Sequence, residues 1–413
     1  MPLKVLICGG GVAGPALAYW LARLGHHVVI VERFPALRAT GAQIDLRGQG
    51  IETVKRMGLM DTVRGKLVDE EGVSVIDSRG KVKAAFLANK SGKGAQSLTS
   101  EYEIMRGDLV RIFHEATKDK VEYVFGKTVD SFTENELGVV AYFSDGSSDT
   151  FDLLVGADGQ GSHVRKNIQP PGAPDEYRQL GVHMAYWIVP RTETDTNMSK
   201  SYIIPGGRMI MTRSHSKSET QVCFILISDS EELRNMPKTS VEGQKDFWAK
   251  RFHDAGWQTD RFIKGMHTTE NWFCQNCVQI KTDTWHSGRV VLLGDAAHCP
   301  SPLTGLGTTS SLVGAYVLAG ELARGENLSQ ALQNYSKTLR PFIDEVQQVN
   351  IWWIRKAVPT SQWGISILHL IIGLACFLRI PQLISRFSED GGGDWKLPDY
   401  PELDVDHTKL NGN

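Results

Sequence analysis

The chain begins with an apolar run of strand length, a glycine-rich turn and a helix-like repeat. Residues 3–8 are nearly all apolar, which is typical of a buried parallel strand. Gly9–Gly14 follows, and a helical repeat then runs from Pro15, a first-turn proline, to a stop at Gly25. A second apolar run, His27–Val31, ends at Glu32. The pattern predicts a strand–helix–strand unit with parallel strands.

Residues 170–283 have a different pattern, in which strand-like runs dominate and phosphate-binding signals are missing. Strands are predicted over 183–189, 201–204, 209–212 and 222–227. A helix over 241–254 would pack on the outer face of their sheet. Residues 73–77 and 81–87 alternate like a hairpin around Ser-Arg-Gly.

The remaining chain returns to strand and helix. Residues 289–293 form another continuous apolar run, and a helical repeat follows residue 307. A long helix is predicted from 328 to 356, then an apolar stretch over 365–380. Residues 388–413, with three consecutive glycines and many charges, indicate a loosely ordered tail.

These elements predict an α/β protein with a parallel-sheet domain, an interleaved β-rich domain and a C-terminal helix. The expected boundaries are 1–170 for the first part of the parallel-sheet domain, with strands near 73–100 joining the β-rich domain; 171–285 for the β-rich domain; 286–345 for the second part of the parallel-sheet domain; 346–390 for bridging helices; and 391–413 for a flexible tail.

Composition narrows the class of protein. The chain has 413 residues and a net charge of −2, so no large field would attract nucleic acid or anionic lipid. Six scattered cysteines fit a reducing compartment. The first strand leaves no room for a signal peptide, which favours the cytoplasm. We expect a monomer without an integral membrane span, because the stretch 365–380 is short and contains His369 and Arg379. It is expected to dock across both domains and close the substrate cavity; the alternative is a helix lying on a membrane surface.

The glycine turn supplies the first candidate chemistry. Gly9, Gly11 and Gly14 form a GxGxxG motif between strand and helix, and Glu32 lies 23 residues past Gly9. Such a unit binds a dinucleotide, with the acid on the adenosine ribose. A second convincing GxGxxG is missing from the sequence, which favours resident FAD with NADPH bound only transiently.

A second motif lies between the later strand and helix: GDAAHCPSPLTGLG over 294–307. Asp295 would accept a hydrogen bond from a ribityl hydroxyl, and Gly305 and Gly307 would let the backbone approach a flat ring. The helix end behind them would stabilise the negative charge of a reduced flavin.

With these motifs the chain resembles group A flavoprotein monooxygenases, and among them the tetracycline-inactivating flavin monooxygenases (tetracycline destructases). The matching pieces are GVAGPALAYWLARLG over 11–25, GAQIDLRG over 41–48, EIMRGDLVRIF over 103–113, the segment GADG ending at 159, and GDAAHCPSPLTGLG over 294–307. The resemblance covers most of residues 3–340. It implies that the parallel-sheet domain is a Rossmann-type FAD-binding domain and that the interleaved β-rich domain is a substrate domain.

The resemblance implies a site for FAD, a transient site for NADPH at Arg38, and dioxygen and a small molecule as reactants. The cofactor residues expected are Gly9, Gly11, Val12, Ala13, Gly14, Glu32, Arg33, Asp45, Arg47, Arg106, Asp158, Asp295, Pro302, Gly305, Leu306 and Gly307. The substrate residues expected are Met184, Arg208, Met211 and Phe224, with His183 and Tyr186 as further candidates. No catalytic side chain and no metal are expected, because the flavin carries the chemistry.

Several residues have plainer interpretations beside these. Asp158 could be an N-cap-like residue, Arg106 a surface salt bridge, and Arg208 and Arg213 solvent-exposed cations. His298 is expected to serve the loop's hydrogen bonding rather than acid–base catalysis. Cys274 and Cys277 form a CxxC that is expected on a strand with packed thiols, not at zinc or a redox centre.

We therefore predict an FAD-dependent, NADPH-consuming monooxygenase that hydroxylates a polycyclic, aromatic or enolic substrate. Tetracycline-type antibiotics fit the resemblance, which implies antibiotic inactivation. The alternative is biosynthetic hydroxylation of another aromatic polyketide or phenolic secondary metabolite. It gains weight because Met184 replaces the family's substrate-contacting amide. Two other classes stay open: a flavin halogenase, of whose Trp-x-Trp signature Trp187–Pro190 matches only a fragment, and a flavoprotein without turnover that acts through 365–380.

Overall fold

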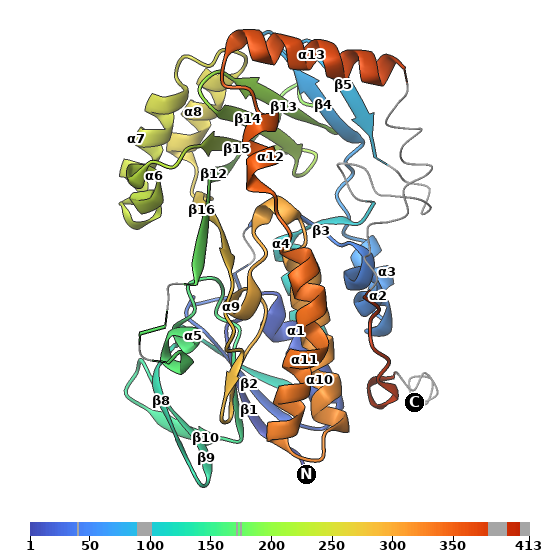
Figure 1. The fold of residues 1–413 in the computed structure, drawn as a ribbon, viewed down its shortest axis with the longest axis vertical. Helices are drawn as coiled ribbons and strands as arrows, with labels where there is room; N and C mark the ends of the chain where they lie inside the picture. Colours follow the sequence, from blue (N-terminus) through green and yellow to red (C-terminus); the bar gives the residue numbers. More distant parts are fainter. Residues whose placement is uncertain (39–40, 89–100, 171, 174–175, 379–394, 405–413) are drawn as a thin grey trace.

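The protein consists of two large sheets at opposite ends of a long axis, joined by helices and short loops (Figure 1). The structure is a computed structural model, and it describes residues 1–413 except 39–40, 89–100, 171, 174–175, 379–394 and 405–413. The α/β fold class predicted from the sequence is confirmed.

The lower sheet has six strands in the order β17-β18-β11-β1-β2-β7. All of its neighbours pair in parallel except β17 with β18. Its strands are β1 Lys4–Cys8, β2 His27–Glu32, β7 Val121–Phe125, β11 Leu153–Gly156, β17 His286–Ser287 and β18 Val290–Leu292. β1, β11 and β18 are almost entirely buried, and β2 is buried at Val28, Ile30 and Val31, which explains the continuous apolar runs.

Helices cover this sheet and connect its strands. They are α1 Ala13–Arg23, α4 Arg106–Thr117, α5 His163–Ile168, α10 Gly307–Arg324 and α11 Leu328–Val346. α1 packs against both α4 and α10. The predicted strand–helix–strand unit is therefore present at the start of the chain.

The upper sheet has seven strands in the order β16-β12-β15-β14-β13-β4-β5. The strands are β4 Gly72–Ile76, β5 Val82–Leu87, β12 Tyr177–Pro190, β13 Met198–Ile204, β14 Arg208–Ser214, β15 Glu219–Ile227 and β16 Phe273–Ile280. The hairpin β4–β5 joins this sheet, as predicted for the segment near residues 73–100; residues 89–100 lie outside the described part of the chain.

The upper sheet has an outer and an inner face. α7 (Val241–Phe252) and α8 (Thr259–Thr268) pack on the outer face together with Trp187, Phe224 and Ile210. The inner face carries Met184, Cys223 and Ile225 and turns toward the lower sheet. Both faces are apolar, so alternation along the strands separates them without revealing which is which.

Smaller elements fill the space around the two sheets. These are β3 Gln43–Asp45 with β6 Glu103–Met105; β8 Val129–Asn135, β9 Gly138–Phe143 and β10 Ser148–Phe151; α2 Gly48–Arg56, α3 Met60–Arg64, α6 Glu231–Asn235 and α9 Asp295–His298; and the 3₁₀ turns η1 Met236–Lys238, η2 Pro302–Thr304 and η3 Pro401–Leu403.

The C-terminal helices differ from the prediction. The single helix expected from 328 to 356 is broken after α11, and α12 (Ile351–Ala357) restarts at the inner face of the upper sheet, where Ile351 packs. Gln347 ends α11 because its buried side-chain amide donates to backbone oxygens of Ile280, His298 and Cys299. α12 thus connects the two sheets, whereas α13 (Gln362–Phe377) lies mainly on β5 and β13 of the upper sheet (Figure 1).

The final described segment packs tightly instead of forming part of a loose tail. Tyr400 is fully buried, its hydroxyl donates to Glu321 at 2.6 Å, and a Cβ on Gly320 would meet its ring at 2.3 Å. The tail predicted over 388–413 is therefore wrong for residues 395–404. None of the described helices combines the length and apolarity needed to cross a membrane.

Candidate flavin site

The glycine turn after β1 forms a close backbone cradle. Gly9 has φ +116°, and a Cβ there would lie 2.4 Å from the carbonyl oxygen of Ala157 at the end of β11. A Cβ on Gly14 would lie 2.1 Å from the Gly9 carbonyl oxygen. Val12 stands at the N-cap of α1 and offers no side-chain hydrogen bond, so the first N–H groups of α1 point out of the turn. A turn this tight needs glycine and lets a pyrophosphate approach a positive helix end.

Glu32 ends β2 beside this turn. Its carboxylate accepts from the backbone N–H of Gly10 at 2.8 Å and of Phe34 at 3.0 Å. The side chain is therefore fixed at the mouth of the glycine turn, where a ribose of a bound dinucleotide would lie. Arg33, also expected at the cofactor, is exposed and stacks over Phe34 at 5.1 Å.

The second cradle lies between β18 and α10. Gly294 has φ +64°, and Asp295 begins the short helix α9. Ser301 has φ +85°, which is strained for a residue with a side chain. Gly305 has φ +65°, and Leu306 caps α10 without a side-chain hydrogen bond. The loop thus holds an irregular backbone in front of a helix N-terminus.

Arg106 connects the two cradles. It begins α4, and its guanidinium lies 3.3 Å from the position of a Cβ on Gly11. Gly41, with φ +143°, leaves room for its aliphatic chain, since a Cβ there would be 3.0 Å from Arg106 Cδ. Burial lowers the pKa of Arg106, while Asp295 and Glu32 favour its charge. Arg106 is half-buried between the two motifs, as the cofactor interpretation requires.

Asp45 and Arg47 form the third wall of the site, beside the two cradles. Arg47 Nη2 lies 2.8 Å from Asp45 Oδ2, and a Cβ on Gly305 would lie 4.0 Å from the same oxygen. Asp45 Oδ1 and Arg47 Nε are buried and have no hydrogen-bond partner among the described residues. Buried polar atoms of this kind are normally satisfied. A bound flavin with its ribityl chain would supply the missing partners.

Asp158 and Arg165 stabilise the GADG segment that ends at residue 159. Asp158 accepts from the Ser162 hydroxyl at 2.5 Å and from the His163 N–H at 2.8 Å. It thus caps α5, as the plainer interpretation proposed. Arg165, for which no role was predicted, is 2% exposed and donates to the Ala296 carbonyl at 2.8 Å. It ties this motif to α9, and Glu176 pairs with it at 2.9 Å.

The inner face of the upper sheet meets the flavin loop. Met184 and Met211 pack with Leu303 from the turn η2 and with Ile351 from α12. The hydroxyl of Tyr186 donates to the Met184 sulfur at 2.8 Å. These three expected substrate residues therefore lie on the side that faces the cradles.

Arg208, Phe224 and His183 lie on the other face, so the structure does not bring them to the site. Phe224 stacks on Phe252 of α7 with ring centroids 4.2 Å apart. Arg208 donates to the Arg251 carbonyl at 2.7 Å and pairs with Asp254. His183 bonds Asn276 at 2.7 Å and the Ser228 carbonyl at 3.0 Å. The prediction of Arg208 and Phe224 as substrate residues is wrong because strand alternation turns both toward the helices.

Arg213 belongs to a buried ionic cluster that the sequence did not reveal. Its guanidinium lies 2.6 Å from Glu103 and 3.0 Å from Glu70, whose side chains are 1% and 2% exposed. Glu103 stands opposite Asp45 in the β3–β6 pair, and Gln43 also donates to it. Burial raises the pKa of Glu103 to about 8, with Asp45 and Glu70 adding to it against Arg213. We term these residues (Gln43, Asp45, Glu70, Glu103 and Arg213) the carboxyl cluster; it links the upper sheet to the wall at Asp45.

His298 and the CxxC cysteines take no part in the site. His298 is 1% exposed, and neither ring nitrogen has a hydrogen-bond partner within the described chain. The expected hydrogen-bonding role in the loop is therefore wrong; burial lowers the pKa of His298 to about 3 and keeps it neutral. Cys277 is buried on β16 and Cys274 partly so, both as free thiols, which confirms the packed interpretation. The described residues contain no group of side chains that could hold a metal ion.

Arg38 lies at the edge between the two sheets. Its guanidinium stacks over Phe34 at 4.9 Å and over Phe273 of β16 at 5.4 Å. Burial lowers its pKa, and Arg33 adds to this. A half-buried cation held by two rings can receive a phosphate without rearranging.

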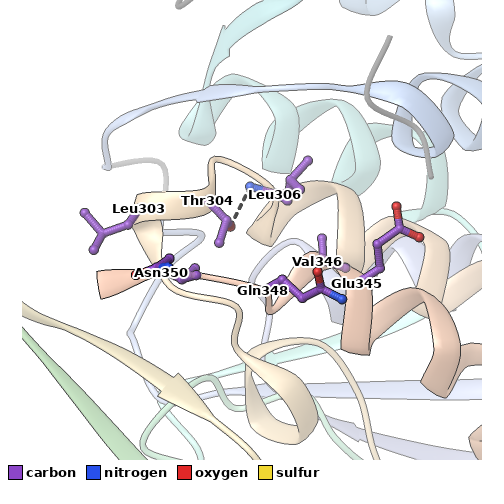
Figure 2. A pocket seen from close by; sticks show the side chains of 8 residues that line it. Leu303, Thr304, Leu306, Glu345, Val346, Gln348 and Asn350 are labelled. Carbon is purple, nitrogen blue, oxygen red and sulfur yellow. Dashed lines mark hydrogen bonds between the residues drawn. The ribbon is translucent and has the colours of Figure 1, made fainter. Parts of the chain in front are cut away.

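A pocket opens beside the flavin loop (Figure 2). It has a volume of about 290 Å³ and lies between the loop side chains and the break between α11 and α12. Its lining residues are Leu303, Thr304, Leu306, Glu345, Val346, Gln348, Val349 and Asn350. The volume is at the small end for ligand pockets, so it suits part of a small molecule better than a whole dinucleotide.

The residues of the three walls fit FAD. A Cβ at Gly9, Gly14 or Gly294 would lie within 3 Å of a neighbouring atom. Two helix N-termini lack side-chain caps, and Asp45 and Arg47 retain atoms without a partner among the described residues. Glu32 suits the adenosine half and the Asp295–Gly307 loop suits the flavin half.

Comparison with known proteins agrees with this fit. The FAD binding domain family matches residues 2–350. The FAD-dependent monooxygenase asL4 of Sarocladium schorii is 41% identical over 424 residues, covering 97% of this chain and 99% of the relative.

Solved structures extend the comparison. The tetracycline destructase Tet(51) superposes with a TM-score of 0.78 at 27% identity, covering 97% of this chain and 100% of that one. Klebsiella pneumoniae HpxO, solved with FAD and uric acid, has a TM-score of 0.70 at 19% identity over 93% of this chain and 96% of that chain, which shows a shared fold.

Proposed function

This chain belongs to the FAD-dependent monooxygenases of group A, and on that premise we propose that it uses NADPH to place one oxygen atom of dioxygen on an electron-rich carbon of a fused-ring substrate. The observation that carries the proposal is the contact between the inner face and the flavin loop, where Met184 and Met211 pack with Leu303. A flat ring held there would lie against the flavin face.

The residues have separable roles in this proposal. FAD supplies hydride acceptance and oxygen activation when bound. The glycine turn and Glu32 would hold its adenosine half, and Arg106, Asp45 and the 302–307 loop would orient the ring. Arg38 would hold a phosphate of NADPH at the edge of the site. The inner face and α12 would exclude water from the reacting carbon.

The inner face supports the proposed substrate class. Its side chains are methionines and other apolar groups, which adapt to flat rings. The guanidinium of Arg213 is held by Glu70 and Glu103. Tetracycline-type molecules are supported as substrates by the likeness to Tet(51) over 97% of the chain. The alternative is another aromatic polyketide or phenolic metabolite, hydroxylated in biosynthesis. It is supported by Met184 in place of an amide and by the higher identity to asL4, which is described only as a monooxygenase.

The test is aerobic NADPH oxidation by the purified protein with and without tetracycline, followed by mass analysis of the drug. Stimulated consumption and a gain of one oxygen atom would support tetracycline inactivation. Unchanged drug with substrate-independent NADPH consumption would favour the biosynthetic alternative, to be followed by a panel of phenolic and fused-ring polyketides. No NADPH oxidation with any of these would refute the proposal.

Two variants sharpen the assay. Arg38→Ala should raise KM for NADPH at least tenfold, whereas the exposed neighbour in Arg33→Ala should change it little. Met184→Gln restores an amide on the inner face, so it should increase turnover of tetracycline relative to the wild type if a missing polar contact limits this substrate.

A further inference from the structure

Helix α13 has one face that is packed and one that is exposed. On the packed side, Ile365 is buried, a Cβ on Gly373 would lie 3.2 Å from the Lys83 carbonyl, and Cys376 Sγ is 3.8 Å from the Ala85 carbonyl. These positions are spaced as one face of a helix, and this face rests on β5.

The opposite face is entirely apolar and open. It consists of seven large side chains, each more than half exposed: Trp363, Ile367, Leu370, Ile371, Leu374, Phe377 and Leu378. At 100° per residue they fall within a stripe about 120° wide. We call these seven residues the apolar stripe. Soluble surfaces rarely keep a contiguous patch of this kind, which marks an interaction site.

The composition of the helix favours lipid over a protein partner. α13 contains no Asp, Glu, Lys or Arg, and its exposed polar side chains, Gln362 and Ser366, are uncharged. Trp363 and Phe377 mark the two ends of the helix and are 83% and 82% exposed. Aromatic side chains with leucine and isoleucine between them are typical of helices that lie in a membrane interface.

Size argues against a second copy of the chain and against a span. A stable dimer needs about 20–30 residues a side, and the stripe offers seven. The helix has 16 residues, so its length of about 24 Å is short of a hydrocarbon core of about 30 Å. A helix lying in the plane of a membrane needs neither a matching partner nor full thickness.

The position of α13 permits contact with a flat surface. It lies across the end of the long axis, beyond the strands of the upper sheet, and the other labelled elements lie below it (Figure 1). A plane can therefore touch the helix along its whole length without meeting the lower sheet or the flavin site.

We propose that α13 docks this protein on the surface of a lipid bilayer, with the apolar stripe at the boundary between headgroups and acyl chains. Docking places the upper sheet next to the membrane and leaves the flavin site in water. The stripe is uncharged, so binding is driven by apolar burial and needs no anionic lipid.

The test is co-sedimentation of the full, flavin-loaded chain with phosphatidylcholine vesicles. The wild type should bind, and raised salt should not release it, because no ion pairs are involved. Ile371→Glu/Leu374→Glu should lower the partition coefficient at least tenfold, since each inserted leucine or isoleucine contributes about tenfold or more. The changed side chains are exposed, so bound flavin and the far-UV spectrum should be unaltered.

Leu137→Glu is the matched control. Leu137 is 82% exposed in the β8–β9 turn near the opposite end of the molecule, so this variant should bind vesicles like the wild type. Failure of the wild type to bind vesicles, or equal binding by the Ile371/Leu374 variant, would overturn the proposal. Sedimentation velocity covers the other occupant: a dimer that dissociates in the Ile371/Leu374 variant, without vesicle binding, would assign the stripe to a second copy instead.

Discussion

Arg213→Met tests the carboxyl cluster, and Arg208→Met is its matched control. Both arginines lie on β14 and have side chains that are 16% exposed. They differ in the carboxylates that each would leave behind. Glu70 and Glu103 are 2% and 1% exposed, whereas the side chain of Asp254, the partner of Arg208, is 55% exposed.

The magnitudes follow from this difference. Removing one partner of a buried ion pair costs about 3–5 kcal/mol, because the remaining charge stays buried. Removing a partner of an exposed carboxylate costs about 0–1 kcal/mol, to which lost hydrogen bonds to backbone carbonyls add about 1 kcal/mol. Arg213→Met should therefore lower the free energy of unfolding by about 1–4 kcal/mol beyond Arg208→Met.

Urea unfolding at pH 8 and pH 5.5 is the assay, with the midpoint read at constant slope. The loss in Arg213→Met should be smaller at pH 5.5 than at pH 8, because Arg213 favours the charged form of Glu103, and Glu103 is largely protonated at pH 5.5 with or without that arginine. Equal losses in the two variants, or a loss in Arg213→Met that is no smaller at the lower pH, would refute the ionic reasoning.

Three further predictions concern single residues. Burial raises the pKa of Glu103 to about 8 in the folded state, above its ordinary 4.5, so the folded chain binds an extra proton and wild-type stability should fall as pH rises from 4.5 to 8. Glu103→Gln should flatten this pH dependence in urea titrations. An unchanged pH dependence would contradict the assignment. The pKa of His298 is lowered from 6.5 to about 3, so its contribution to stability should be lost as pH falls from 6.5 to about 3. His298→Phe should reduce the fall of the melting temperature at acid pH and leave NADPH oxidation intact. Loss of turnover would point to a chemical role. Gly14→Ala puts a Cβ 2.1 Å from the Gly9 carbonyl and should abolish flavin retention on a desalting column. In the control Gly25→Ala the new Cβ meets no atom within 4 Å, so this variant should keep its flavin and lose about 1 kcal/mol of stability. A Gly14→Ala protein that retains flavin would refute the role of the glycine turn.

The sequence predicts those features that are set by short stretches of the chain. The glycine turn, Glu32 and the 302–307 loop follow from spacing, because the glycines and the acid of a dinucleotide-binding unit stand at fixed offsets along the chain. The strand–helix–strand unit followed from continuous apolar runs that only a sheet covered on both faces can use.

The sequence does not show which face of the upper sheet is the inner one, because this depends on tertiary contacts. Arg208 and Met211 are three apart on one strand, so they point to opposite faces, and alternation alone shows that both cannot line one cavity. Which face is inner depends on where α7, α8 and Leu303 pack, and these lie far away in sequence. Phe224 was misplaced for the same reason.

Long-range packing explains the other differences. Tyr400 stands in a charged segment, and only the gap above Gly320 buries it. The carboxyl cluster joins β3, β6, a loop and β14, which share no sequence signal. Gln347 breaks the predicted long helix by bonding the flavin loop, a contact that helical periodicity cannot reveal.

The measurement that tests the central claim most directly is the flavin content of the purified chain, released by denaturation and identified by chromatography. The account predicts close to one FAD per chain, because Glu32 and the glycine turn are built for the adenosine half and the 302–307 loop for the ring. A chain that purifies without flavin and cannot be loaded, or one that holds FMN in place of FAD, would contradict it.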